Sequence, residues 1–157
     1  MIGAVDDTHR RLLELGLELP PPASPFGAYV EAVQSGNLLF LSGTLPAVAR
    51  EPKYVGRIGA ELSAEEGRAA TRLAALNGLA IAKEHLGSLD RIVRVVRLGV
   101  MLVTTAEFAE QPKTADAASE LLRDVFGVDR IPVRLVYGVA SLPLGMPVEL
   151  DMIFEVA

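Results

Sequence analysis

Several residue types are scarce or missing in this chain of 157 residues. It contains no cysteine, which excludes disulfides, thiolate metal sites and a cysteine nucleophile. Only two histidines are present, His9 and His85, and they fall in separate predicted helices, so the sequence indicates no histidine-based metal site. Any catalytic group must therefore be sought among other side-chain types.

Long apolar runs and a surplus of positive charge are also missing. The longest apolar stretch, LGVMLV at 98–103, is far shorter than the ~20 residues that a membrane-spanning helix needs. Residues 1–19 carry charges throughout and lack the basic-then-apolar order of a secretory signal. We therefore expect a cytoplasmic protein with no membrane partner. The formal net charge of −5 argues against nucleic acid as a partner, because phosphate binding needs a basic patch.

The N-terminal part combines leucines and charges, and a run of prolines follows. Residues 5–17 predict a short amphipathic helix that ends near Gly16. The segment LPPPASP at 19–25 favours an extended connector, because proline is poorly tolerated in helices and in sheets. We predict two regions: 1–26 with the N-terminal helix and connector, and a domain at 27–157 to which the helix is an appendage.

The next part of the chain contains a hairpin pattern and a well-marked helix. YVEAVQ, a turn at 35–37 and LLFLSG predict a β-hairpin, and YVGRIGAEL at 54–62 suggests a third strand. Ser63 and Glu66 fit a capping box, which predicts a helix from there through His85 with Gly87 as its stop. Its expected core-facing stripe comprises Ala69, Leu73, Leu76 and Ala80.

The C-terminal half predicts three strands and one more helix. Residues 91–104 are rich in β-branched side chains and apolar on both faces over their second half, which is typical of an interior strand. A helix over about 113–125 follows, with Ala117, Leu121 and Leu122 inward, and strands at 133–140 and 147–156 finish the chain. The order β-β-(β)-α-β-α-β-β predicts an α+β sandwich with two helices on one face of a mixed sheet.

The other face of this predicted sheet has no helix to cover it. The last strand alternates between apolar and mostly acidic residues, but the interior strand presents apolar side chains on both sides. A large exposed apolar patch usually marks a subunit interface. The pattern therefore predicts a homo-oligomer.

Arg134 and Glu149 are the residues most suggestive of chemistry. Arg134 lies on the strand face opposite Leu135 and Tyr137, and Glu149 lies on the next strand of the chain, which we expect to be its neighbour. A guanidinium matches a carboxylate with a planar fork of donors, and a partly desolvated carboxylate can orient a water and move protons. The alternative is an ordinary cross-strand ion pair on a solvated face, and the residues alone favour that alternative.

Other candidate residues have equally plain explanations. Ser42 and Gly43 end a strand where a hydroxyl and backbone N–H groups can bind a carboxylate, but Ser-Gly is also common in turns. Tyr29 offers a phenol that hydrogen-bonds a ligand or simply packs. Asp116 near the start of a helix is favoured there by the helix dipole. No Ser-His-Asp set and no glycine-rich phosphate loop can be assembled.

Three segments together resemble the RidA/YjgF family, whose members also carry the labels endoribonuclease L-PSP and translation-initiation inhibitor. The resemblance covers residues 27–157 and is most specific between Arg134 and Glu149. It is nearest to a longer branch of the family with an extra N-terminal helix. The segments are YVEAVQSGNLLFLSGTLP, EFAEQPKTADAASELLRDVFG and RLVYGVASLPLGMPVELD.

The resemblance implies a chorismate-mutase-like fold and a homotrimer with an inner β-barrel and outer helices. It implies clefts between subunits that bind small carboxylate metabolites, and cofactor-free hydrolysis of 2-imino and enamine acids to 2-keto acids and ammonia. An alternative is non-catalytic binding or sensing of such metabolites by the same cleft. A third function, endoribonuclease, conflicts with the acidic charge.

By the same resemblance, Arg134 clamps the substrate carboxylate and Glu149 positions the attacking water. These two are the expected catalytic residues. Tyr29 lines the cleft, and Ser42 with Gly43 forms the strand-end pair near the ligand.

Two positions depart from the family pattern. Val136 stands where the deaminases usually have a cysteine, and Asp116 stands where many members have an asparagine. Asp116 therefore joins the expected substrate-binding residues. Its carboxylate would repel an anionic ligand unless it were protonated or turned away.

Overall fold

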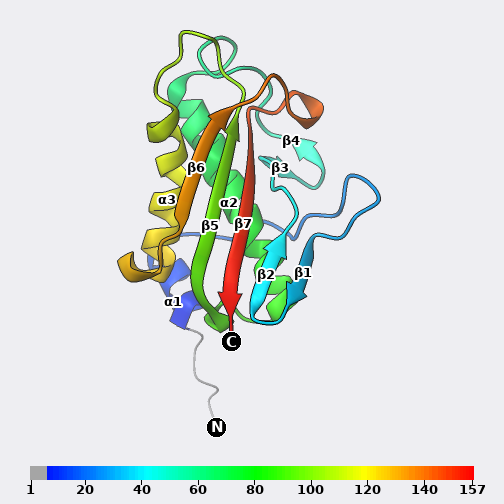
Figure 1. Cartoon of the computed structure of the whole chain (residues 1–157), viewed down its shortest axis with the longest axis vertical. Helices are drawn as coiled ribbons and strands as arrows, with labels where there is room; N and C mark the ends of the chain where they lie inside the picture. Colours follow the sequence, from blue (N-terminus) through cyan, green and yellow to red (C-terminus); the bar gives the residue numbers. More distant parts are fainter. Residues whose placement is uncertain (1–6) are drawn as a thin grey trace.

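The computed structural model describes residues 7–157 as two packed layers, a mixed sheet and the helices on one of its faces (Figure 1). The predicted α+β class, with two long helices on one face of the sheet, is confirmed. The helices are α1 (Asp7–Glu14), α2 (Ala64–Leu86) and α3 (Gln111–Phe126), with short 3₁₀ turns at Leu89–Arg91, Val128–Arg130 and Pro143–Gly145. The strands of the main sheet are β1 (Ala32–Ser35), β2 (Leu38–Leu41), β5 (Ile92–Leu102), β6 (Val133–Gly138) and β7 (Val148–Val156).

The main sheet has the order β1-β2-β7-β5-β6, so the last strand of the chain lies in its middle. β7 pairs antiparallel with β2 on one side and with β5 on the other. β6 pairs parallel with β5. Parallel neighbours need a crossover connection, and helix α3 forms that connection between β5 and β6. The edge strands are therefore β1 and β6.

The predicted hairpin is confirmed as β1 and β2, but the predicted third strand at 54–62 is wrong. The short strands that precede it, β3 (Ala47–Val48) and β4 (Glu51–Pro52), pair only with each other. Residues 54–62 run irregularly because Gly56 and Gly59 have φ of 125° and 96°, which a pleated strand does not allow. Ile58 between them is still fully buried, and an isolated bridge joins it to Thr104.

Helix α2 begins and ends as its sequence predicts, but its buried side is different. Ser63 and Glu66 form the reciprocal capping box, and Gly87 ends the helix in the left-handed conformation. Ala69 of the predicted stripe is exposed, and only Ala80 of that stripe is fully buried. Apolar residues lie around most of this helix, which contacts both α3 and the sheet, so periodicity alone does not select one face. No helix within residues 7–157 is long and apolar enough to cross a membrane.

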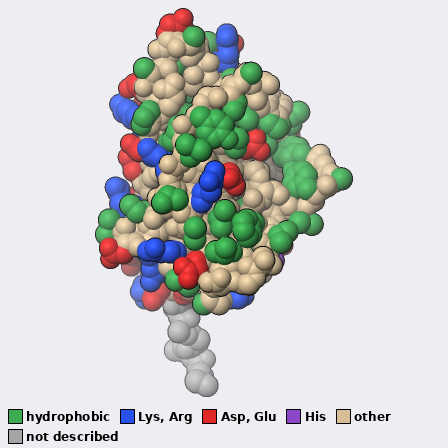
Figure 2. All heavy atoms as spheres, viewed as in Figure 1, with side chains coloured by type: hydrophobic (Ala, Val, Ile, Leu, Met, Phe, Trp, Pro, Cys, Tyr) green, Lys and Arg blue, Asp and Glu red, His purple; other side chains and the backbone are tan. Residues whose placement is uncertain are grey.

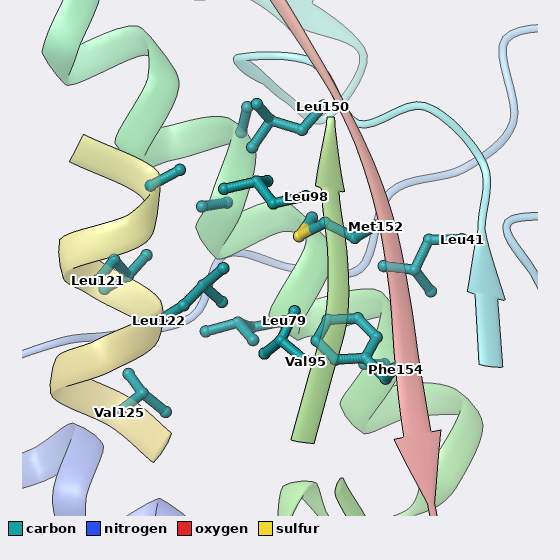
Figure 3. Close-up of a cluster of buried hydrophobic side chains, with 14 of the residues drawn as sticks. Leu41, Leu79, Val95, Leu98, Leu121, Leu122, Val125, Leu150, Met152 and Phe154 are labelled. Carbon is teal, nitrogen blue, oxygen red and sulfur yellow. The ribbon is translucent and has the colours of Figure 1, made fainter. Parts of the chain in front are cut away.

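The hydrophobic core lies between the helices and the sheet (Figure 3). The inward positions predicted for α3 and the alternation predicted for β7 are confirmed, since their apolar side chains interdigitate there. Burial of each large side chain contributes roughly 1.5–3 kcal/mol. The labelled contributors are Leu121, Leu122 and Val125 of α3, Leu79 of α2, Val95 and Leu98 of β5, Leu41 of β2, and Leu150, Met152 and Phe154 of β7.

Helix α1 is held on the domain by a carboxylate from a distant turn. Asp90 accepts hydrogen bonds from the backbone N–H groups of Asp7 and Thr8, each at 2.8 Å, and from the Thr8 hydroxyl. These bonds satisfy donors that the first turn of a helix leaves free. Leu12 joins the hydrophobic core with 3% of its surface exposed. The helix is thus packed on the domain, and the division at residue 26 stays a prediction.

Asp90→Ala should detach the start of α1 from the domain. The lost capping bonds predict a decrease of about 1–2 kcal/mol in the free energy of unfolding. Urea denaturation measures this decrease, and hydrogen exchange of the amides at 7–14 should accelerate more than exchange in α2. Asp129→Ala removes an exposed acidic side chain nearby and serves as the control. Equal effects of the two substitutions would contradict the role of Asp90.

Candidate functional site

The face of the sheet that carries no helix is apolar over much of its area. We call this surface the open face. Figure 2 shows hydrophobic side chains gathered on it, on either side of a basic and an acidic side chain. The expected uncovered apolar surface is therefore present. Its exposed large side chains are Val33, Phe40, Val133, Leu135 and Tyr137.

An ion pair crosses the open face between its apolar parts. The Arg97 Nε atom lies 3.4 Å from the Asp151 Oδ2 atom, and both side chains are a little under half exposed. Gly99, the register partner of Asp151, leaves room beside that carboxylate. The sequence reasoning missed this pair, because β5 and β7 are distant in sequence and nothing local indicates that they are neighbours.

Arg134 points away from the open face, toward helix α3. Its Nη1 group donates to the Asp116 carboxylate at 2.6 Å and to the Ser119 hydroxyl at 3.0 Å. Asp116 and Ser119 are three residues apart and therefore lie on the same side of the helix. That spacing was the available signal for Ser119, which the sequence reasoning missed. Asp116 is thus turned toward the arginine and balances its charge.

Glu149 lies on the open face at the start of β7, against the end of β2. A Cβ atom at position 43 would overlap the Glu149 carboxylate, so only glycine leaves the space that this side chain occupies. Partial removal of Glu149 from water raises its pKa above the ordinary value, because burial disfavours the charged form. Gly43 and Glu149 therefore lie side by side, and the carboxylate binds a proton more readily than an exposed one.

Arg134 and Glu149 do not meet within one chain, and their expected placement on neighbouring strands is wrong. β5 lies between β6 and β7, because the chain passes from an edge strand to the middle of the sheet. Glu149 is paired with Met101, whose partner on β6 is Tyr137. Arg134 also faces the opposite side of the sheet. The cross-strand ion pair considered as the plain alternative is therefore absent.

Ser42 joins the segment that follows the connector to the end of β2, and Tyr29 closes a turn within that segment. The Ser42 hydroxyl donates to the Val30 carbonyl at 2.5 Å, and the backbone N–H of Phe26 donates to the Tyr29 phenol oxygen at 2.9 Å. Tyr29 and Gly43 also border one pocket. The structure thus places Tyr29, Ser42, Gly43 and Glu149 around one end of β2, and it places Asp116 and Arg134 elsewhere.

Glu31 is a further acidic residue of this region that the sequence reasoning missed. It borders the same pocket as Tyr29 and Gly43, and burial raises its pKa above the ordinary value. An acidic residue between Val30 and Ala32 in an apolar segment was the available signal. The acidic and histidine side chains of residues 7–157 form no group of three or more that would hold a metal ion.

Comparison with known proteins shows the family to which the chain belongs. Residues 9–155 match the model of the family described as "YjgF/chorismate mutase-like, putative endoribonuclease". The chain belongs to the YjgF/RidA family. The resemblance seen in the sequence is thereby confirmed, and the match extends into helix α1.

This YjgF/RidA protein is similar to proteins of several organisms. It is 42% identical over 146 residues to Protein TCP17 of Trypanosoma cruzi, covering 92% of this chain and 91% of that protein. It resembles the crystal structure of a putative endoribonuclease from Shewanella oneidensis with 34% identity and a TM-score of 0.91, covering 95% and 99% of the two chains. It also resembles RidA from an Antarctic Psychrobacter with 25% identity and a TM-score of 0.61, covering 88% and 96%.

The raised pKa of Glu149 predicts a pH-dependent effect of Glu149→Gln on stability. The folded chain binds a proton on Glu149 more readily than the unfolded chain. The contribution of Glu149 to the free energy of unfolding is therefore greatest below the ordinary pKa of 4.5, and it falls as pH rises through the raised pKa. Glu149→Gln should therefore raise the melting temperature at about pH 7.5, by roughly 1–3 °C, and this gain should vanish below pH 4.5.

Glu155→Gln on the same strand and face is the matched control for loss of a negative charge. Melting curves of both variants and wild type at equal protein concentration measure the effect. A gain that is the same in the two variants, or that persists in acid, would show that desolvation of Glu149 is not its cause.

Proposed function

We propose that this protein hydrolyses small 2-imino and enamine acids to 2-keto acids and ammonia, without a cofactor, in clefts between the subunits of a homotrimer. The observation that carries the proposal is the division of the expected site into two halves. Arg134 with Asp116 and Ser119 forms one half, and Glu149 with Gly43 forms the other.

The two halves complement each other only if two copies of the chain contribute to one site. Arg134 and Glu149 are separated by strand β5 and lie on opposite faces of the sheet. A single side chain does not bridge that separation, but the β6 edge of one copy can lie against the β2–β7 end of another. The site would then take its cationic group from one subunit and its carboxylate from the next.

The open face and the β6 edge support such an assembly. The open face exposes large apolar side chains that a second and a third copy would cover. Strand β6 is an unpaired edge with apolar residues exposed along it, and such an edge is normally protected or used for association. The Arg97–Asp151 pair on the same face would fix the register of the subunits through charge.

Arg134 would bind the substrate carboxylate with the part of its guanidinium that the protein leaves available. Nη1 is occupied by Asp116 and Ser119, which orient the group. Nε and Nη2 have no hydrogen-bond partner among residues 7–157, and this edge of the guanidinium matches a carboxylate with two parallel donors. Asp116 weakens the net positive charge at the clamp, so binding of an anion would be moderate.

Glu149 would supply the proton transfer. Water attacks the imine carbon while Glu149 accepts its proton, and the resulting carbinolamine takes that proton on nitrogen. Glu149 then takes the proton of the new hydroxyl group and passes it to the nitrogen, the C–N bond breaks, its electron pair leaves with ammonia, and the hydroxyl oxygen becomes the carbonyl oxygen of the 2-keto acid. A carboxylate with a raised pKa suits both steps, because it accepts a proton from water more readily than an ordinary carboxylate and its protonated form can still donate to nitrogen.

The assay uses 2-aminoacrylate, generated in situ from serine by a pyridoxal-phosphate-dependent dehydratase, and follows pyruvate. Wild type should accelerate pyruvate release, and Arg134→Ala and Glu149→Gln should each abolish the acceleration. If wild type gives no acceleration over spontaneous hydrolysis, the hydrolase is wrong for this substrate. Stabilisation by a 2-keto acid in wild type but not in Arg134→Ala would then favour the binding or sensing alternative.

Mixing the two inactive variants tests whether the site is shared between subunits. Arg134→Ala and Glu149→Gln, unfolded and refolded together in equal amounts, should recover about a quarter of the wild-type activity, because half of the subunits supply each intact residue. Refolding each variant alone is the control. No recovery in mixed trimers, with their composition verified by native mass spectrometry, would contradict a shared site.

Asp116→Asn should strengthen substrate binding. It keeps an oxygen that accepts from Arg134 but removes a negative charge close to the bound carboxylate. We expect KM to fall by about 2- to 5-fold with kcat unchanged. Ser119→Ala removes the neutral partner of the same Nη1 group and is the control. An unchanged KM in Asp116→Asn would show that Asp116 does not weaken the clamp.

A further inference from the structure

Asp116 of helix α3 uses only one of its two carboxylate oxygens within the chain. Its Oδ1 atom accepts from Arg134 Nη1 at 2.6 Å, and its Oδ2 atom makes no hydrogen bond to any group within residues 7–157. The side chain is 46% exposed, so this second oxygen is accessible from outside the chain. The carboxylate therefore has a free acceptor beside the proposed clamp.

The other cations around this part of α3 are paired elsewhere. The Nζ atom of Lys113, in the first turn of the helix, lies 3.8 Å from the Glu110 carboxylate. Arg68 of α2 pairs with Glu120, one turn beyond Asp116, at 2.9 Å. In the part of the chain that the structure describes, only the clamp arginine lies within ion-pair distance of Asp116.

One arginine and one aspartate leave this half of the proposed cleft without net charge. A substrate whose only charge is a carboxylate is attracted by Arg134 and repelled by Asp116. An asparagine at position 116 would still accept from Arg134 and would not repel the substrate. The carboxylate therefore disfavours simple anions, and it favours a ligand that brings a cation of its own to the free oxygen.

We propose that the cleft selects substrates that carry a cationic side chain in addition to the carboxylate. This inference rests on the proposed function and narrows its substrate class to the imines of basic amino acids. The substrate carboxylate takes the Nε and Nη2 edge of Arg134, and the substrate cation takes Oδ2 of Asp116. The cation has to reach from one edge of the guanidinium to the other, so a long side chain, as in arginine, fits.

Isothermal titration calorimetry of the full chain with δ-guanidinovalerate and δ-ureidovalerate tests this selection without any chemical step. The two probes share the carboxylate and the chain length, and only the guanidino compound carries a positive charge. Wild type should bind δ-guanidinovalerate at least about tenfold more tightly than δ-ureidovalerate. Asp116→Asn should bind the two probes about equally, because it removes the charge that distinguishes them.

Glu120→Gln is the matched control, since it removes a negative charge from the same helix one turn away and should keep the preference. Absence of δ-guanidinovalerate binding, or equal binding of the two probes by wild type, would overturn the proposal. A preference that survives in Asp116→Asn would also overturn it. If a neighbouring subunit supplies the cation for Asp116, Asp116→Asn should weaken the assembly and leave the preference unchanged, which likewise contradicts the proposal.

Turnover separates failure of this inference from failure of the proposed function. An L-amino-acid oxidase supplies the imines of L-arginine and L-citrulline, which differ in charge as the two probes do. Wild type should hydrolyse the arginine imine with a kcat/KM at least about tenfold higher. Asp116→Asn should lower that kcat/KM about tenfold, although it lowers KM for 2-aminoacrylate. Opposite effects of one substitution on two substrates exclude loss of folded protein as the cause.

The remaining outcomes fall on one proposal or the other. Hydrolysis of 2-aminoacrylate with equal kcat/KM for the arginine and citrulline imines would overturn the charge selection and leave the hydrolase in place. Absence of hydrolysis of every imine, with δ-guanidinovalerate still preferred in calorimetry, would overturn the hydrolase and support the selection as a property of a binding site.

Discussion

The antiparallel pairing of β7 with β5 decides which side chains reach the core and which reach the open face. It runs from the pair Leu102–Val148 to the pair Ile92–Val156 and sets the alternation of both strands. A shift by one residue would turn the buried Met152 and Phe154 outward and bring Asp151 into the core. The apolar layer against α2 and α3 therefore fixes the register, and the register places Glu149 beside Gly43.

The same register explains why the polar groups of this protein are divided. Side chains of β5 and β7 that point to the helices are buried, and Arg134 at the β6 edge is held by α3. Side chains that point to the open face include Glu149 and the Arg97–Asp151 pair. Since the sheet itself separates these two sets, chemistry that needs both of them depends on association between copies.

The sequence predicted those features that local physics controls. The caps of α2 are short-range hydrogen bonds between residues three or four apart, and the alternation of β7 follows from burial of one side of a strand. The place of β7 in the sheet was not predictable in this way, because strand order depends on long-range packing. The strand predicted at 54–62 is absent for a local reason, since two glycines with positive φ interrupt a segment of otherwise strand-like composition.

Among the candidate site residues, the contact between Gly43 and Glu149 and the partners of Arg134 became clear only from the positions of β7 and α3. The residues that line the pocket bordered by Tyr29 and Gly43 come from three separate parts of the chain, 21–31, 43–50 and 77–81. No single sequence pattern joins Glu31, Thr44, Arg50 and Asn77, so that pocket is a product of the tertiary structure alone.

The bonds that Asp90 makes to helix α1 have a consequence for the order of folding. A helix of 8 residues is too short to persist in water, and here its first turn is satisfied by a carboxylate more than eighty positions away. Helix α1 can therefore form only after the turn at Leu89–Arg91 and the adjoining surface of α3 exist. Its helicity reports whether the remainder of the domain has already folded.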